Sequence, residues 1–313
     1  MKARVERNLD TLDLGISIGA LHLQNPVLTA SGTFGYGEEL ADYIDLNQLG
    51  GIVCKTVTRH SRSGNPPPRT CETPAGMLNA IGLQNVGVEQ FIQKKLPFLR
   101  KLHTPLVVNV AGETIEDFAF LVRSLSEQEG VAAFELNISC PNVAHGLDFA
   151  TNPTMTEQVV AHARAATHLP VIAKLSPNVT DIGIIARAAE AGGADALSLV
   201  NTFVGMAIDT RTHRPRLSNV VGGLSGPAIK PLAVRAVYRC AQEVRIPLIG
   251  IGGIVSGNDA IEFILAGASA VQVGTATFVQ PDAAIEVLEG IKEYCHRHEV
   301  SNIRQLIGAV QTQ

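Results

Sequence analysis

Eight short apolar runs, rich in β-branched residues, alternate with segments of helical period along this sequence. The runs are PVLTAS, GIVCK, PLVVN, AFELN, VIAKL, ALSLVN, PLIGIGG and AVQVGT. Continuous apolar strands separated by helices are typical of a parallel sheet that is covered on both faces. Eight such units in 313 residues predict an α/β fold, a closed (β/α)8 TIM barrel, with an open doubly wound sheet as the alternative.

No linker, low-complexity tract or shift in charge divides the sequence, so we expect a single domain over residues 1–313. Helical period is clearest in IEDFAFLVRSLSEQEG, EQVVAHARAATH, DIGIIARAAEAGG, AVRAVYRCAQEV and NDAIEFILAGA. The two longest gaps between strands contain residues 59–85 and 202–227, which are rich in Pro and Gly. We expect both segments to form inserted loops over the carboxyl ends of the strands.

The net charge of −4, without a run of like charges, indicates neither nucleic acid nor an anionic membrane as a partner. The start, MKARVERNLDTLDL, lacks the apolar region of a signal peptide, and no stretch approaches the roughly 20 apolar residues of a membrane span. We therefore expect a cytoplasmic protein. The cysteines form no C-x-x-C pair, so we expect no metal site, cluster or disulfide framework; they are Cys54, Cys71, Cys140, Cys240 and Cys295.

Each of the eight apolar runs ends in a polar residue or a glycine. In a barrel these ends meet on the face that holds the active site; they are Ser31, Lys55, Asn109, Asn137, Lys174, Asn201, Gly252 with Gly253, and Gly274 with Thr275. The glycines after the last two strands, together with GGLSG at 222–226, favour a phosphate bound by backbone N–H groups. No G-x-G-x-x-G motif opens a dinucleotide domain, so a mononucleotide is the better hypothesis.

Asparagine side chains both donate and accept hydrogen bonds, which suits a planar ring such as a pyrimidine or a flavin. We interpret Lys55 and Lys174 as ligand contacts, because a buried ammonium needs an anion or a carbonyl. Cys140 follows Asn137 and precedes Pro141, which restricts it to an extended conformation at the barrel mouth. Its thiol could be a nucleophile or a general base.

Ten blocks, in order along nearly the whole chain, resemble the class 1 dihydroorotate dehydrogenases, and most closely class 1B. They are NPVLTASGTFGYGEE, GGIVCKTVT, GNPPPR, MLNAIGLQN, ELNISCPNV, AKLSPNVTDI, LVNTFVGMAIDT, GGLSGPAIKP, GIGGI and VQVGTATF. The position of Cys54 often holds threonine in this family, and we have no functional account of the cysteine.

This resemblance implies an FMN enzyme of pyrimidine biosynthesis that oxidises dihydroorotate to orotate. Cys140 would take the proton from C5 while hydride leaves C6 for the flavin. Lys55 would lie near the substrate carboxylate, and Lys174 would stabilise reduced flavin. The implied substrate-binding residues are Lys55, Asn79, Ala80, Ile81, Gly82, Leu83, Asn137, Asn142, Asn201 and Thr202. The implied FMN-binding residues are Ala30, Ser31, Lys55, Thr56, Asn109, Asn137, Lys174, Val200, Gly226, Gly252, Gly253, Gly274 and Thr275.

Class 1B resemblance also implies a partner subunit that carries FAD and a 2Fe–2S cluster and passes electrons to NAD+. We expect a homodimer of this chain joined to that partner in a heterotetramer. A class 1A enzyme, a homodimer that uses fumarate, is the alternative acceptor type. Class 2 enzymes use serine as base and carry an N-terminal membrane-binding extension, so Cys140 and the short start argue against that class.

Three other hypotheses for the function of this chain remain open. A dihydropyrimidine dehydrogenase-like flavoprotein would resemble SCPHG, whereas this chain has SCPNV. A Schiff-base aldolase or lyase barrel would use Lys174 as the nucleophile and would be colourless. A non-catalytic binding barrel would not need the thiol of Cys140.

Overall fold

The computed structural model describes residues 12–139 and 149–312. Its largest sheet contains all eight predicted strands: β3 (Val27–Thr29), β4 (Ile52–Val53), β7 (Leu106–Val110), β8 (Val131–Asn137), β9 (Val171–Lys174), β10 (Ala196–Leu199), β15 (Leu248–Ile251) and β16 (Ala268–Val273). Their order is β3-β16-β15-β10-β9-β8-β7-β4, and the paired neighbours are parallel. A parallel bridge between Leu28 and Gly51 joins the two ends of this order. The prediction of a (β/α)8 barrel is therefore confirmed.

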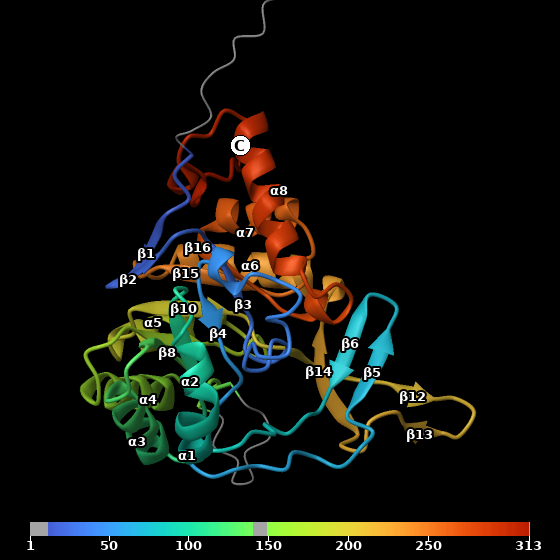
Figure 1. Cartoon of the computed structure of the whole chain (residues 1–313). Coiled ribbons are helices and arrows are strands. Elements are labelled where there is room, and N and C mark those ends of the chain that lie inside the picture. The colour runs from blue at the N-terminus through green and yellow to red at the C-terminus, as the bar shows by residue number, and fades with distance from the viewer. Residues whose placement is uncertain (1–11, 140–148, 313) are drawn as a thin grey trace, which may run out of the picture.

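Helices surround the ring of strands (Figure 1). The α-helices are α1 (Val88–Gln90), α2 (Leu96–Leu99), α3 (Ile115–Ser126), α4 (Pro153–Ala165), α5 (Ile182–Ala191), α6 (Lys230–Ala241), α7 (Gly257–Ala266) and α8 (Ala283–Arg297). Shorter helical turns are η1 (Leu46–Gln48), η2 (Phe91–Lys95), η3 (Pro227–Ile229), η4 (Thr275–Phe278) and η5 (Ile303–Leu306). The side chains of Thr114 and Ser256 accept hydrogen bonds from the first turns of α3 and α7, which fixes where these helices begin.

The two segments that we expected to be loops contain strands and pair with each other. β5 (Thr70–Thr73) and β6 (Gly76–Asn79) join β11 (Phe203–Met206) and β14 (Val221–Ser225) in an antiparallel sheet of order β11-β14-β6-β5. A small ribbon, β12 (Ile208–Asp209) with β13 (Arg214–Pro215), extends from it beside the barrel (Figure 1). The predicted insertions are therefore present, but they contain paired strands that were not expected, because β6 and β14 pair across more than 140 residues, which no local pattern reveals.

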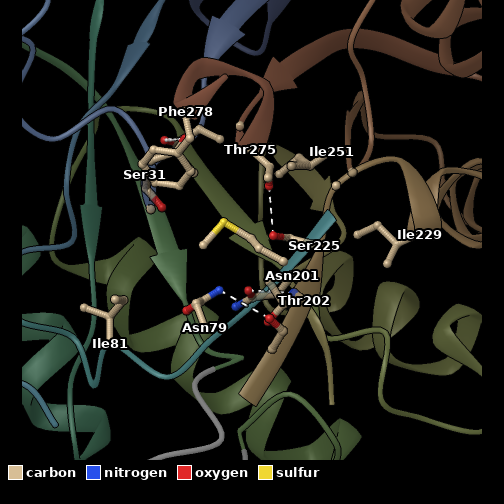
Figure 2. Close-up of a pocket in the computed structure, with 18 of the residues that line it drawn as sticks. Ser31, Asn79, Ile81, Asn201, Thr202, Ser225, Ile229, Ile251, Thr275 and Phe278 are labelled. Carbon is tan, nitrogen blue, oxygen red and sulfur yellow. Dashed lines mark hydrogen bonds between the residues drawn. The ribbon is translucent and has the colours of Figure 1, made fainter. Parts of the chain in front are cut away.

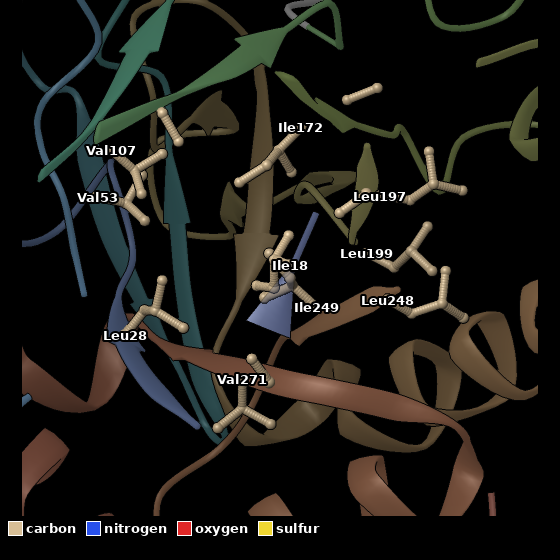
Figure 3. Packing of buried hydrophobic residues seen from close by; sticks show 14 of the residues in the cluster. Ile18, Leu28, Val53, Val107, Ile172, Leu197, Leu199, Leu248, Ile249 and Val271 are labelled. Carbon is tan, nitrogen blue, oxygen red and sulfur yellow. The ribbon is translucent and has the colours of Figure 1, made fainter. Parts of the chain in front are cut away.

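The core is built from the apolar residues of the barrel strands. Figure 3 shows Leu28, Val53, Val107, Ile172 and Val271 packed around the ring, each almost fully buried. Ile18 lies among them and comes from an N-terminal hairpin, β1 (Ile16–Ile18) with β2 (Leu21–Leu23). This rigid ring fixes the positions of the polar residues that follow each strand. None of the helices in the described part of the chain has the length and apolar character needed to cross a bilayer.

Candidate active site

A cavity of about 320 Å³ lies at the carboxyl ends of the barrel strands. This volume falls in the range of roughly 300–1,000 Å³ that is usual for small-molecule sites. The sequence-predicted residues that line it are Ala30, Ser31, Lys55, Thr56, Asn79, Ala80, Ile81, Gly82, Leu83, Asn137, Lys174, Val200, Asn201, Thr202, Gly226, Gly252, Gly253, Gly274 and Thr275. The structure thus brings together residues from both inserted segments and from seven of the eight strand ends.

Amide side chains gather at one end of the cavity. Asn201 Nδ2 donates to Ser139 Oγ at 2.6 Å and approaches Asn137 Oδ1 at 3.4 Å, while Asn201 Oδ1 accepts from the Thr202 N–H at 2.8 Å. Asn79 Nδ2 lies 3.4 Å from the Gly223 carbonyl, so β6 holds this amide beside β14. Figure 2 shows Asn79, Asn201 and Thr202 close together. These groups offer both donors and acceptors to a planar polar ring.

The opposite end of the cavity is formed largely by backbone. Gly253 has φ +73°, which L-residues with side chains rarely adopt, and a Cβ there would come within 2.8 Å of the Gly226 carbonyl oxygen. Thr275 Oγ1 donates to Ser225 Oγ at 2.8 Å and ties the end of β16 to β14 (Figure 2). Glycine-rich turns of this kind let backbone N–H groups approach a phosphate, so this end fits a phosphate-bearing cofactor.

Lys55 lines the cavity just beyond β4. Its backbone N–H donates to the Gly35 carbonyl at 2.8 Å, which fixes the point where the side chain leaves the barrel. Burial lowers the pKa of the Lys55 ammonium below its ordinary 10.5, and the nearby charge of Arg69 lowers this pKa further. Among the described residues, Lys55 Nζ has neither a hydrogen bond nor an ion pair. The ammonium is therefore available to an anionic ligand.

Lys174 lines the cavity from the end of β9, but its ammonium also faces the barrel interior. Its Nζ lies 3.5 Å from Glu135 Oε1, and the Glu135 side chain is fully buried. Asn109 does not line the cavity: its Nδ2 donates to the same carboxylate oxygen at 2.6 Å. β7 continues to Val110, so Asn109 is not the last residue of its strand as the sequence analysis assumed.

Two predicted site residues, Cys140 and Asn142, lie outside the described residues. Sequence reasoning also missed part of the cavity wall. The additional lining residues are Gly32, Thr33, Thr70, Met77, Gly223, Ser225, Ile229, Ile251, Ile254, Val255, Ala276 and Phe278. Most are apolar or small and carry no chemical signal in the sequence, whereas Gly223 and Ser225 lie in the GGLSG segment that was noted for its glycines.

The comparisons with known proteins agree with this geometry. The family model described as "Dihydroorotate dehydrogenase" matches residues 14–295. The "Dihydroorotate dehydrogenase B (NAD(+)), catalytic subunit" of Pelobacter propionicus is 54% identical over 300 residues, which are 96% of this chain and 99% of that protein. The protein of the same name from Trichlorobacter lovleyi is 56% identical over 299 residues, 95% of this chain and 98% of that protein.

A solved structure has the same fold. Dihydroorotate dehydrogenase from Eimeria tenella, in complex with ferulenol, superposes with a TM-score of 0.80. The match covers 99% of this chain and 91% of that one, at 23% sequence identity. At this identity the likeness shows the barrel fold alone.

Proposed function

The chain belongs to the dihydroorotate dehydrogenase family, and we propose that it oxidises dihydroorotate to orotate in pyrimidine biosynthesis, as the catalytic subunit of an NAD+-linked enzyme. The observation that carries this proposal is the convergence of three amides, glycine-rich backbone and one ammonium without a partner among the described residues on one cavity. A carboxylate-bearing pyrimidine and a flavin need such groups. The names of relatives above 50% identity support the substrate and the acceptor.

We infer that the resident cofactor is FMN. Gly226 after β14 and Gly252 and Gly253 after β15 lie side by side and would leave backbone exposed where a phosphate would bind, and Lys174 and Asn137 line the same cavity. These residues fit a flavin mononucleotide better than a dinucleotide, because no G-x-G-x-x-G motif opens a dinucleotide domain in the sequence. Bound FMN would supply the acceptor for the hydride that leaves C6 of the substrate.

The substrate would lie against the amide end of the cavity. Asn79, Asn137, Asn201 and Thr202 would bind its ring, and Lys55 would bind its carboxylate. The segment from Ala80 to Leu83 would close one side of the ring, and Asn142 would add a further amide. This arrangement would orient C5 and C6 and would favour ligands that carry a carboxylate.

Cys140 is the proposed base that removes the proton from C5, and its thiolate Sγ would accept that proton. A general base typically contributes about 10²–10⁴-fold to the rate. The variant Cys140→Ser should therefore lose turnover by that order while it retains FMN and orotate binding. Turnover close to that of the unmodified protein would remove Cys140 from the mechanism.

The electron route to NAD+ would require a second subunit. The five cysteines of the sequence form no C-x-x-C pair, and the relatives are named as catalytic subunits, which supports a separate partner. We propose that the partner carries FAD and a 2Fe–2S cluster and joins a homodimer of this chain. The chain alone should not reduce NAD+ with dihydroorotate, and it should do so after that partner is added. Rapid NAD+ reduction by the chain alone would contradict this part of the proposal.

A further inference from the structure

A buried polar cluster lies inside the barrel directly below the cavity. It consists of Glu135, Asn109, Gln272 and Lys174, and we call it the Glu135 cluster. Glu135 lies two residues before Asn137 on β8, so both side chains point to the same face of the strand. Since Asn137 lines the cavity, the Glu135 carboxylate lies one layer deeper in the barrel.

Both carboxylate oxygens of Glu135 are used. Oε1 accepts from Asn109 Nδ2 at 2.6 Å and faces Lys174 Nζ at 3.5 Å, while Oε2 accepts from Gln272 Nε2 at 2.6 Å. Gln272 comes from β16, which is not a neighbour of β8 in the sheet, so its side chain reaches across the barrel interior. Strands from different parts of the ring thus converge on this one carboxylate.

The charges of this cluster are almost completely shielded from water. The Glu135 side chain is 0% exposed and the Lys174 side chain 7%. A charged group is rarely buried to this extent without a partner, because the partner offsets the loss of hydration. Lys174 is the counter-ion of Glu135, and it is also the member of the cluster that lines the cavity. The carboxylate is therefore linked to any bound ligand through a single ammonium.

We propose that Glu135 is a positioning residue that acts through Lys174: its carboxylate anchors the ammonium and offsets part of its charge, which limits how strongly the cavity stabilises an anionic, reduced flavin. This inference rests on the proposed function. Removing the negative charge while retaining Lys174 should leave the ammonium uncompensated. Reduced flavin, which carries more negative charge than oxidised flavin, should then bind relatively more tightly.

The variant Glu135→Gln tests this with little change of shape. The new amide oxygen can still accept from Asn109, but the amide N–H groups would meet the donor Nε2 of Gln272. Gln272 Oε1 has no hydrogen-bond partner among the described residues, so rotation of the Gln272 amide presents it as an acceptor. The network can therefore re-form, and the variant should fold. Glu289→Gln on α8 is the matched control, because it changes the net charge equally at a side chain that is 51% exposed.

The experiment measures the midpoint potential of bound FMN in the full chain, by anaerobic spectroelectrochemical titration, with thermal melting to check that each variant folds. Glu135→Gln should raise the ratio of affinities for reduced and oxidised flavin at least tenfold, which corresponds to about 30 mV for a two-electron couple. Glu289→Gln should leave the potential unchanged. In a Lys174→Met background, the effect of Glu135→Gln should disappear, because the proposed route runs through the ammonium.

An unchanged or lower potential in a folded, flavin-bound Glu135→Gln protein would overturn the inference, and the proposed function would stand. The same rise in the Lys174→Met background would also overturn it, because Glu135 would then act directly on the cavity. If the unmodified protein bound no flavin at all, the proposed function and this inference would fail together.

Discussion

Replacing Lys55 by methionine removes the one cavity-lining ammonium that has no partner among the described residues and keeps most of the apolar stem. A hydrogen bond to a charged group contributes about 1.5–3 kcal/mol net. At about 1.4 kcal/mol for each factor of ten, loss of one such bond to the substrate carboxylate should weaken orotate binding about 10- to 150-fold. Burial already disfavours the ammonium of Lys55 in the unliganded protein, as its lowered pKa indicates. The free energy of the bond to the carboxylate should therefore appear as binding affinity for the anion.

The assay is an orotate titration of the FMN-bound protein, followed by the change in the flavin absorption bands. A pyrimidine without the carboxylate provides the control ligand, and its affinity should be the same in the unmodified protein and in Lys55→Met. If the variant still holds FMN and its orotate dissociation constant changes less than twofold, Lys55 does not bind the carboxylate. An equal loss of affinity for both ligands would show instead that the substitution disturbs the ring-binding end of the cavity.

Three further outcomes follow from the structure. Orotate affinity should be highest while Lys55 is protonated and should fall as the pH rises through the pKa of Lys55, which burial lowers. Orotate titrations between neutral and alkaline pH should show this decline beginning below pH 10.5, and a flat profile would contradict the role of Lys55. Burial raises the pKa of Cys54 to about 12, so this thiol should react slowly. Alkylation of the native protein at pH 8, mapped by mass spectrometry, should therefore modify the half-buried Cys71 and spare Cys54. Rapid labelling of Cys54 would contradict its burial. The substitution Gly253→Ala should lower the free energy of unfolding by about 1–2 kcal/mol through backbone strain. It should also weaken FMN binding, because its Cβ would lie 2.8 Å from the Gly226 carbonyl oxygen. Chemical denaturation and flavin titration measure the two effects, and tight FMN binding would contradict a phosphate site at this turn.

The barrel could be predicted from sequence because its signals are local. Each strand is a short apolar run, and its pairing partners follow from the right-handed βα repeat, so no long-range information was needed. The antiparallel sheet beside the cavity is different. β14 contains two adjacent glycines and none of its residues is buried, so it shows no alternating pattern that would indicate a strand. A helix after the last strand follows from the predicted eight βα units, although the segment of α8 was not among those named for their helical period; its buried residues, among them Val287 and Ile291, follow that period.

The polar strand ends identified most of the cavity, but their depth could not be read from the sequence. Asn109 appeared to be a strand end, yet β7 continues by one residue and the amide binds Glu135 in the layer below. The sequence does contain a signal for Glu135, because a carboxylate in the middle of an apolar strand must find a buried partner. One of the partners of Glu135 is Gln272, which lies 137 residues away in the sequence, and only the closed ring brings the two side chains together.

The central claim is that this chain binds a flavin in the described cavity and reduces it with dihydroorotate. The absorption spectrum of the purified protein, recorded anaerobically before and after addition of dihydroorotate, tests it most directly. Flavin bands that bleach on addition of dihydroorotate, without any partner present, are the predicted result. A colourless protein that remains inert after FMN is supplied would contradict the claim, and a borohydride-trapped adduct on Lys174 in that protein would identify a Schiff-base barrel instead.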